Sequence, residues 1–323
     1  MDDTTTPTGE WATIYAERLH NLAGLTQVNA DGATPEQAAA SAAWSAPFGP
    51  PEPSDAVTTG SEVPGPNGPV PVRIYRHADG RTSGAGLVWF HGGGFRHGSL
   101  DMPEGDLVAR GLVTRTHAVV VSVDYRLCHD GVHHPVPHDD CFAAFRHTVE
   151  HAGDLGIDPT RVAVGGASAG GNLAGGVALH GRDAGILLWQ SLLAYPVMHA
   201  SLPEYSPQLL AAVARMPRGI GFVDRVREMN ENYLGGPLEE HARDRYAFPG
   251  EATDLTGLSP TYIENCEFDD LRASGERYAA QLADAGVDVT LVTAAGVPHG
   301  HLNAIGSPLT AATLDRFAER LTR

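Results

Sequence analysis

Short apolar runs alternate with longer amphipathic stretches over most of the chain. The apolar runs are rich in valine, leucine and isoleucine, as is typical of strands buried on both faces of a parallel sheet. We expect strands at 87–90, 119–123, 162–164, 186–189, 261–263 and 289–292. Helical spacing between these runs predicts helices at 106–115, 141–151, 172–180, 272–285 and 309–321. This alternation predicts an α/β fold in which helices flank a mostly parallel central sheet.

The first part of the chain departs from this alternation. Apolar residues at 11–25 recur at helical spacing, and residues 34–37 have the pattern of a capped second helix. The proline-rich stretch at 47–53 cannot continue a helix. We therefore expect residues 1–50 to form a helical cap segment and residues 51–323 to form the main domain.

A second interruption of the alternation lies at about 199–223. Scattered prolines surround an apolar run at 209–213 there, and we expect a second cap segment. Just ahead of the first apolar run, Asn67 and Gly68 favour a turn, and the residues at 70–75 favour a strand.

The composition excludes several chemistries. The sequence contains no lysine, so its 22 basic residues are all arginines. A Walker A phosphate loop and a Schiff-base enzyme both need a lysine amine, and neither can be built here. The net charge of −17 creates a negative field that repels nucleic acid and anionic membrane surfaces. We therefore expect no nucleic-acid partner and no membrane partner.

The cysteines and the first residues of the chain indicate the cellular compartment in which the protein is expected. Cys128, Cys141 and Cys266 have neither CxxC nor zinc-like spacing, which favours free thiols in a reducing cytoplasm. The chain opens acidic and polar, whereas a signal peptide opens with positive charge. The most apolar stretch, at 186–195, is much shorter than the roughly 20 residues that cross a bilayer. We expect a cytoplasmic protein.

A serine lies where a nucleophile is expected. The strand at 162–164 leads into the sequence G-A-S-A-G at 166–170, which is the G-x-S-x-G pattern between a strand and a helix. Such a turn strains the serine backbone and raises the hydroxyl of Ser168 above the sheet edge. The N–H of Ala169 then lies at a helix N-terminus, where it can stabilise an oxyanion. A serine that only caps a helix is the alternative, which the flanking strand and helix disfavour.

A glycine-rich loop follows the strand at 87–90, with the sequence H-G-G-G-F. Successive glycines let backbone N–H groups approach a tetrahedral intermediate without side chains between them. We expect the N–H groups of Gly93 and Gly94 to complete the oxyanion hole with that of Ala169. An ordinary flexible loop is the alternative, which the position after a strand and ahead of Ser168 disfavours.

A nucleophilic serine needs an acid and a histidine base, which follow it in that order in such folds. His299 and His301 follow the last apolar strand, and His299 is favoured because Gly300 frees the turn after it. Spacing does not choose among the carboxylates that follow the preceding strand. These are Glu267, Asp269 and Asp270.

Further short motifs surround these residues. They are D-Y-R-L at 124–127, G-I-D-P at 156–159, Y-L-G at 233–235, E-F-D-D-L-R at 267–272 and G-V-P-H-G at 296–300. Together with the two glycine motifs, they resemble the hormone-sensitive-lipase-like family of bacterial carboxylesterases over roughly residues 70–320. The resemblance implies the α/β-hydrolase fold, Asp269 as the catalytic acid beside His299 and Ser168, a cap formed by the N-terminal helices, and a homodimer.

The chain departs from the family pattern in a histidine-rich stretch. Its imidazoles and carboxylates belong to His129, His133, His134, His138, Asp139 and Asp140. Such groups could bind zinc, but the neighbouring prolines restrict their convergence. We expect a solvated loop leading into a helix that Asp139 or Asp140 caps, with no metal site.

These observations predict a serine carboxylesterase that hydrolyses small esters with short acyl groups. Ser168 would form an acyl-enzyme intermediate, His299 would be the general base and Asp269 would orient it. This mechanism requires no cofactor. An amidase or a metabolite deacetylase would use the same residues and remains an alternative. A ligand receptor on an inactive hydrolase scaffold is disfavoured because His299 is present.

Overall fold

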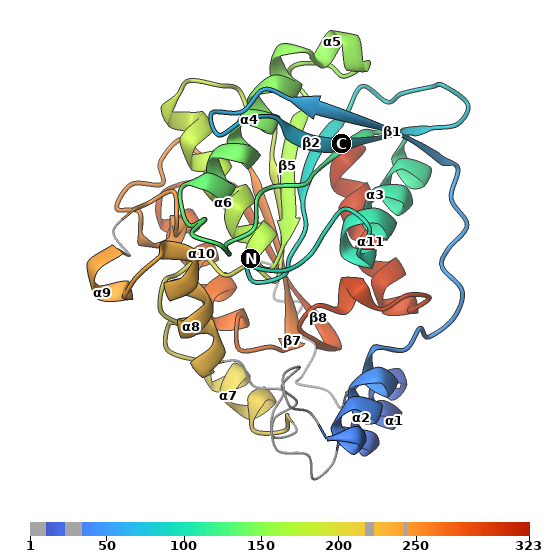
Figure 1. Cartoon of the computed structure of the whole chain (residues 1–323), viewed down its shortest axis with the longest axis vertical. Coiled ribbons are helices and arrows are strands. Elements are labelled where there is room, and N and C mark those ends of the chain that lie inside the picture. Colours follow the sequence, from blue (N-terminus) through green and yellow to red (C-terminus); the bar gives the residue numbers. More distant parts are fainter. Residues whose placement is uncertain (1–10, 23–33, 217–222, 242–243) are drawn as a thin grey trace.

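The computed structural model describes residues 11–22, 34–216, 223–241 and 244–323. Within these ranges a twisted sheet forms the centre of the molecule (Figure 1). It has eight strands in the order β1-β2-β4-β3-β5-β6-β7-β8. β2 pairs antiparallel with β1 and β4, and the other neighbours are parallel, so the expected mostly parallel sheet is confirmed. The strands are β1 (Ala56–Val63), β2 (Val70–His77), β3 (Gly86–Phe90), β4 (Val119–Val123), β5 (Val162–Ala167), β6 (Ser191–Ala194), β7 (Thr261–Phe268) and β8 (Val289–Pro298).

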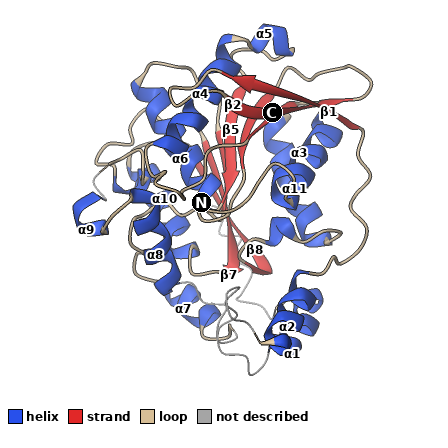
Figure 2. Ribbon diagram, in the orientation of Figure 1, coloured by secondary structure: helices blue, strands red, loops and turns tan. Residues whose placement is uncertain are grey.

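Helices cover both faces of this sheet (Figure 2). Leu112 of α3 (Pro103–Thr116) and Phe317 of α11 (Pro308–Leu321) belong to the hydrophobic core on one face. Phe145 of α4 (Val136–Glu150), Leu173 of α6 (Ala169–Asp183) and Leu282 of α10 (Arg272–Asp284) belong to the core on the other face. Every residue of β3 to β7 is buried. This explains why β3 to β6 consist mostly of apolar and small residues without alternation, whereas β7 also buries Glu264 and Glu267. The remaining helices are α5 (Ala152–Leu155), α7 (Pro207–Val213), α8 (Val223–Leu234), α9 (Leu238–His241), η1 (Pro249–Glu251) and η2 (His301–Asn303).

The residues just ahead of the N-terminal helices α1 (Thr13–Leu22) and α2 (Pro35–Ser45) pack against the carboxyl ends of the last two strands. The ring of Trp11 stacks on Phe268, the last residue of β7, with centroids 3.9 Å apart. The N–H of Ala12 donates to the carbonyl of Gly296 in β8 at 3.1 Å. α2 begins at Pro35, as the sequence pattern predicts. The division into a cap at 1–50, a main domain at 51–323 and a second cap at 199–223 stays a prediction, and residues 1–10, 23–33 and 217–222 lie outside the described ranges.

Some local predictions were wrong. The apolar run at 186–189 is not a strand, because the chain enters the sheet only at Ser191 and leaves Leu187 58% exposed. Neither Asp139 nor Asp140 caps a helix, because α4 begins at Val136 and Pro137 lies in its first turn, a position that suits proline. The sequence analysis also missed β1, whose central residues are polar and exposed at the sheet edge.

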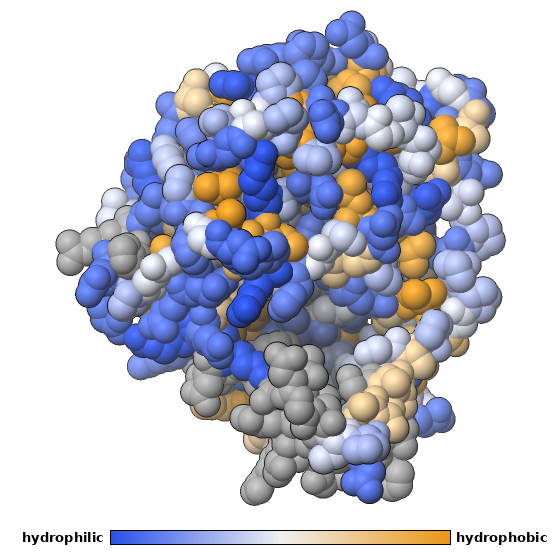
Figure 3. Space-filling model, in the orientation of Figure 1, coloured by the Kyte–Doolittle hydropathy of each residue, from blue (hydrophilic) through white to orange (hydrophobic). Residues whose placement is uncertain are grey.

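Charged and polar residues predominate on one face of the molecule (Figure 3). On the face drawn in Figure 3, hydrophobic residues form separate small groups between polar ones. The large hydrophobic side chains exposed in the described ranges lie far apart in the sequence: Val57, Leu187, Leu210 and Leu291. No helix among the described residues is long and apolar enough to cross a lipid bilayer. The three cysteines are free and buried, which confirms the prediction of free thiols.

Candidate active site

Ser168 stands at the junction of β5 and α6, and its backbone is strained. Its φ of 55° and ψ of −118° lie where a side chain is rarely tolerated, and its N–H is fixed by the carbonyl of Ala194 at 2.9 Å. The turn is tight enough that a Cβ on Gly166 would lie 2.2 Å from the carbonyl oxygen of Gly170. The glycines of the G-x-S-x-G motif are therefore required by the close approach of strand and helix. The hydroxyl of Ser168 is held at the carboxyl edge of the sheet.

His299 lies between Ser168 and Asp269. Its Nε2 is 3.0 Å from Oγ of Ser168, and its Nδ1 is 2.7 Å from Oδ2 of Asp269. Asp269 is the first residue after β7, and His299 is the first residue after β8. The strands β5 to β8 are parallel, so their carboxyl ends lie at the same edge of the sheet. Ser168 and His299 are therefore hydrogen-bonding partners although they are 131 positions apart in the chain.

The other candidates for the acid and the base have different partners. Asp270 accepts a hydrogen bond from the hydroxyl of Tyr205 at 2.8 Å. Glu267 accepts the N–H of Gly296 at 2.7 Å. His301 is buried, with Nδ1 3.3 Å from Sγ of Cys266 and Nε2 2.8 Å from Oγ1 of Thr313. Of the three carboxylates left open by spacing, Asp269 is seen to hydrogen bond to His299, at 2.7 Å.

The electrostatic environment of His299 favours its protonated form. Burial opposes a charge on the imidazole, but the charge and hydrogen bond of Asp269, with the charges of Glu104 and Asp270, outweigh it and raise the pKa of His299 above its usual value. In contrast, burial lowers the pKa of His301 to about 4. The imidazole of His299 is therefore a stronger base than that of His301.

The glycine-rich loop after β3 lies beside the serine. Gly93 and Gly94 have φ values of 115° and 62°, in the region that favours glycine. A Cβ on the preceding Gly92 would lie 3.2 Å from Cβ of Ser168, which places this loop against the nucleophile turn. Met229 of α8 covers the loop, because its Sδ would lie 2.9 Å from a Cβ on Gly94. The N–H of Ala169 belongs to the first turn of α6, where the helix dipole adds positive potential.

A buried carboxylate that the sequence analysis missed connects these parts. Glu104 is 2% exposed and lies in the first turn of α3. Its Oε1 accepts the N–H of Gly92 at 2.5 Å, and its Oε2 accepts the hydroxyl of Tyr195 at 2.7 Å and the side-chain amide of Asn303 at 3.1 Å. The ring of Tyr195 meets that of His299 edge to face, with centroids 5.0 Å apart. Glu104 thus joins the glycine loop to the surroundings of the imidazole.

The histidine-rich stretch does not gather its imidazoles around one point. Nδ1 of His133 hydrogen bonds to the carbonyl of Asn232 at 2.7 Å, and Nε2 of His134 pairs with Asp244 at 2.9 Å. His138 is buried against His180, with ring centroids 5.3 Å apart. Burial, helped by nearby imidazoles, lowers the pKa of His138 to about 3, so this side chain is neutral at physiological pH. His133 and His134 connect the segment ahead of α4 to Asn232 and Asp244, and His138 packs α4 against His180 of α6. The prediction of a solvated stretch was wrong for His138 and Asp140, which are buried.

Fold and site together define a class, the α/β hydrolases that carry a serine nucleophile. Residues 87–303 match the family described as the alpha/beta hydrolase fold. The chain belongs to that family, in its hormone-sensitive-lipase-like group of bacterial carboxylesterases. The predicted fold is confirmed, and the protein is a serine hydrolase that acts on ester bonds.

Several characterised proteins are similar to this chain. Carboxylesterase NlhH of Mycobacterium tuberculosis is 38% identical over 263 residues, which cover 79% of this chain and 78% of that protein. The esterase of Pyrobaculum calidifontis has a solved structure with a TM-score of 0.73 and 31% identity, covering 84% of this chain and 86% of that one. A more distant relative, arylacetamide deacetylase of Bos taurus, is 29% identical over 289 residues, covering 72% of each chain.

Proposed function

We propose that the protein is a carboxylesterase that hydrolyses small esters with short acyl groups through an acyl-enzyme formed on Ser168. The observation that carries this proposal is the pair of hydrogen bonds at His299, 3.0 Å to Ser168 and 2.7 Å to Asp269. A serine hydroxyl, an imidazole and a buried carboxylate in this order form a proton-transfer system that generates an alkoxide nucleophile.

The proposed reaction has two halves. In the first, Oγ of Ser168 attacks the ester carbonyl, Nε2 of His299 takes the serine proton, and the same proton then goes to the leaving alcohol. In the second, His299 deprotonates water, which attacks the acyl-enzyme and releases the carboxylic acid. Asp269 holds Nδ1–H of the imidazole and stabilises the imidazolium that forms in both halves.

The proposed oxyanion hole consists of the N–H groups of Gly93, Gly94 and Ala169. The two glycines have the positive φ values that direct successive amides toward one side of a loop, and Ala169 contributes the dipole of α6. Each such donor stabilises the transition state by about 3 kcal/mol. No cofactor takes part in these steps.

Short acyl groups fit the restricted access to the nucleophile. Ser168 is only 7% exposed, and the side chain of His299 is 15% exposed. α8 lies over the glycine loop and the N-terminal helices lie at the ends of β7 and β8, so we infer that the cap segments limit the length of the acyl chain. The homodimer and the cytoplasmic location expected from the sequence are part of the same proposal. Gel filtration with light scattering tests the dimer.

Two assays test the function. A fluorophosphonate reagent, followed by mass spectrometry of the digested protein, is expected to modify Ser168 in the wild type and nothing in Ser168→Ala. A series of p-nitrophenyl esters from acetate to decanoate is expected to give the highest kcat/KM at acetate to butyrate. Labelling of a residue other than Ser168 contradicts the proposed nucleophile, and a maximum at decanoate contradicts the short-acyl preference.

A deacetylase or amidase is the second candidate function. It is favoured by the similarity to arylacetamide deacetylase, and the same hydrogen-bonded residues would perform it. The comparison of p-nitrophenyl acetate with p-nitroacetanilide separates the two candidates, because these substrates share the acyl group and differ in the bond broken. Hydrolysis of the anilide that is lost in Ser168→Ala identifies an amidase activity, and hydrolysis of the ester alone supports the carboxylesterase.

A further inference from the structure

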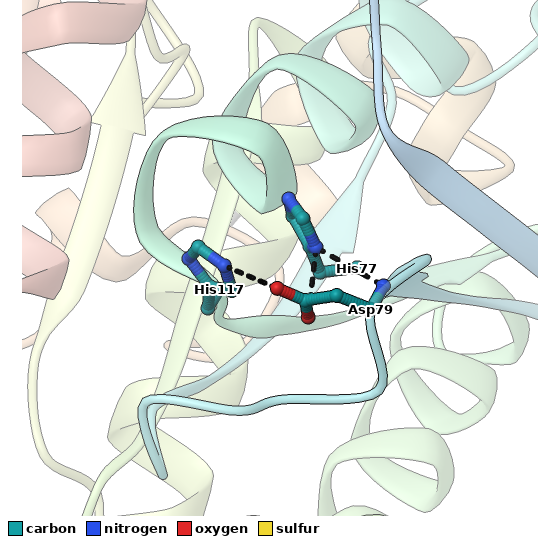
Figure 4. Close-up of side chains that lie close together, drawn as sticks. All are labelled: His77, Asp79 and His117. Carbon is teal, nitrogen blue, oxygen red and sulfur yellow. Dashed lines mark hydrogen bonds and ion pairs between the residues drawn. The ribbon is translucent and has the colours of Figure 1, made fainter.

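A second group of convergent polar side chains lies at the opposite edge of the sheet. His77 is the last residue of β2, Asp79 lies in the turn that follows, and His117 ends α3 just ahead of β4. Figure 4 shows the carboxylate of Asp79 directed toward both imidazoles. Ser168, Asp269 and His299 follow the carboxyl ends of their strands, whereas this group lies at the amino end of β4.

The three side chains are spaced as the ligands of one small cation would be. Nδ1 of His77 is 2.9 Å from Oδ1 of Asp79, and Nε2 of His117 is 3.4 Å from Oδ2 of Asp79. One ligand atom from each residue lies within 4.8 Å of the other two. Zinc bound tetrahedrally at about 2.1 Å separates its ligand atoms by about 3.4 Å. The rings of His77 and His117 are stacked, with centroids 4.0 Å apart, so one imidazole must rotate about its side-chain bonds to direct its nitrogen toward a shared ion.

His117 has an unusual conformation for its position. It occupies the C-terminal cap of α3 with a φ of 54°, a left-handed conformation that glycine or asparagine normally adopts at a helix end. Its Nε2 is buried, and within the described residues it has the 3.4 Å contact with Asp79 but no hydrogen bond of good geometry. Backbone strain together with an imidazole nitrogen that lacks a hydrogen bond is a combination expected at a functional position.

Backbone hydrogen bonds hold His77, Asp79 and His117 close to one another, independently of contacts between their side chains. The N–H of Ser83 donates to the carbonyl of His117 at 3.0 Å, which joins the turn after β2 to the end of α3. The N–H of Gly80 donates to the carbonyl of His77 at 3.0 Å and closes the turn that contains Asp79. The backbone positions of the ligands are therefore fixed before any ion binds, which lowers the entropy cost of binding.

Charged neighbours of the group suit a cation. The backbone N–H of Arg81 donates to Oδ1 of Asp79 at 2.9 Å, and Nε of Arg81 donates to Oδ2 at 2.8 Å, so the carboxylate is held in place at the turn. The guanidinium of Arg81 is 2.7 Å from Oδ2 of Asp79, but it is 77% exposed and can turn into solvent at little cost. Asp55 lies 3.8 Å from Nε2 of His77, the ring nitrogen that would face away from the ion. A carboxylate behind a liganding imidazole is a frequent feature of zinc sites.

We propose that His77, Asp79 and His117 bind one zinc ion, with water completing the coordination. Two imidazoles and a carboxylate are ligands that Zn²⁺ accepts, and they provide too few oxygens for Ca²⁺. The ion would join the turn after β2 to the α3–β4 connection and stabilise the folded chain without entering the ester reaction. This site is distinct from the histidine-rich stretch at 129–140 considered in the sequence.

Calorimetric titration of the metal-free protein with ZnCl₂ tests this proposal. The wild type is expected to bind one zinc ion per chain at this site, and excess zinc at about 100 times Kd is expected to raise Tm by about 5 °C. His117→Asn removes one ligand but keeps a residue that tolerates the left-handed cap, and Asp79→Asn removes the carboxylate charge. Loss of a residue that only hydrogen bonds to a zinc ligand weakens zinc binding roughly 10- to 100-fold. Each of these substitutions removes a ligand itself, so we expect each to weaken zinc binding by more than that.

His147→Asn is the matched control. His147 of α4 and His151 at the end of that helix form a stacked imidazole pair, with ring centroids 4.0 Å apart, and this pair is the obvious place for adventitious zinc. The control is expected to keep the affinity and the Tm increase of the wild type. Absence of zinc binding in the wild type, or loss of binding in His147→Asn with full binding in His117→Asn, overturns the proposal.

A crystal of the wild type grown with ZnCl₂ provides a test that does not depend on how the variants fold. Anomalous density at the zinc edge is expected between His77, Asp79 and His117. Anomalous density only at other histidines overturns the assignment.

Discussion

Replacement of Glu104 by glutamine is expected to weaken the enzyme in two measurable ways. Glutamine has nearly the same shape, but one oxygen becomes an NH₂ group. The two glutamate oxygens accept hydrogen bonds from donors on opposite sides, the N–H of Gly92 and the amide of Asn303. Whichever way the new amide is turned, its NH₂ group faces one of these donors. At least one buried donor therefore loses its acceptor.

The expected magnitude follows from that count. A buried donor without an acceptor costs about 1–3 kcal/mol, and the remaining hydrogen bonds lose the contribution of a charged acceptor. We expect Glu104→Gln to lower the free energy of unfolding by about 3 kcal/mol. A loosened Gly92 displaces the neighbouring glycine amides, so kcat/KM should fall roughly tenfold to hundredfold, less than the loss caused by deleting an oxyanion donor outright.

The pH dependence separates a local electrostatic effect from general damage. The charge of Glu104 raises the pKa of His299, and the imidazole must be neutral to act as a base. Removal of this charge lowers the pKa, so the acidic limb of kcat/KM against pH should move to lower pH in Glu104→Gln. The matched control is Glu239→Gln, which removes an exposed carboxylate and should leave this limb in place. An acidic limb that does not move in Glu104→Gln refutes the electrostatic reasoning.

Three further predictions follow from the proposed site. Ser168→Ala should lower kcat by about a millionfold with the Tm nearly unchanged, and wild-type turnover would make this serine structural. Asp269→Asn should lower kcat by about ten-thousandfold because it favours the wrong tautomer of His299, whereas Asp270→Asn should cost little. The reverse result would mean that Asp270 is the catalytic acid. EDTA should leave p-nitrophenyl acetate hydrolysis unchanged at 25 °C, and a loss of turnover restored by zinc would contradict a metal-free reaction.

The parts of the site that the sequence analysis identified are those encoded locally. The segment around Ser168 consists of a strand, a serine flanked by glycines and a helix within about twenty residues. Each of these has a recognisable sequence pattern. The preference for His299 over His301 rested on Gly300, and the choice of Asp269 rested on a family resemblance. The structure gives Asp269 and His299 a shared hydrogen bond because β7 and β8 are parallel neighbours.

Glu104 could not be predicted from the sequence, because nothing local marks it as buried. A glutamate in the first turn of an amphipathic helix is normally a solvated residue that favours the helix dipole. Its partners Gly92, Tyr195 and Asn303 are 12, 91 and 199 positions away, and only the folded sheet brings them together. Similarly, the strand at 186–189 was misplaced because apolar composition does not show where a chain enters a sheet.

The surroundings of His299 explain why a buried imidazole can still be an effective base. Burial alone disfavours the imidazolium, and it lowers the pKa of the nearby buried His301 to about 4. The negative charges of Asp269, Glu104 and Asp270 reverse this effect, and Asp269 also accepts a hydrogen bond from the ring. In the proposed reaction the imidazolium forms in each half, so these carboxylates stabilise the transition states more than the resting enzyme. Enzymes of this chemistry therefore need buried charges that a hydrophobic core alone would exclude.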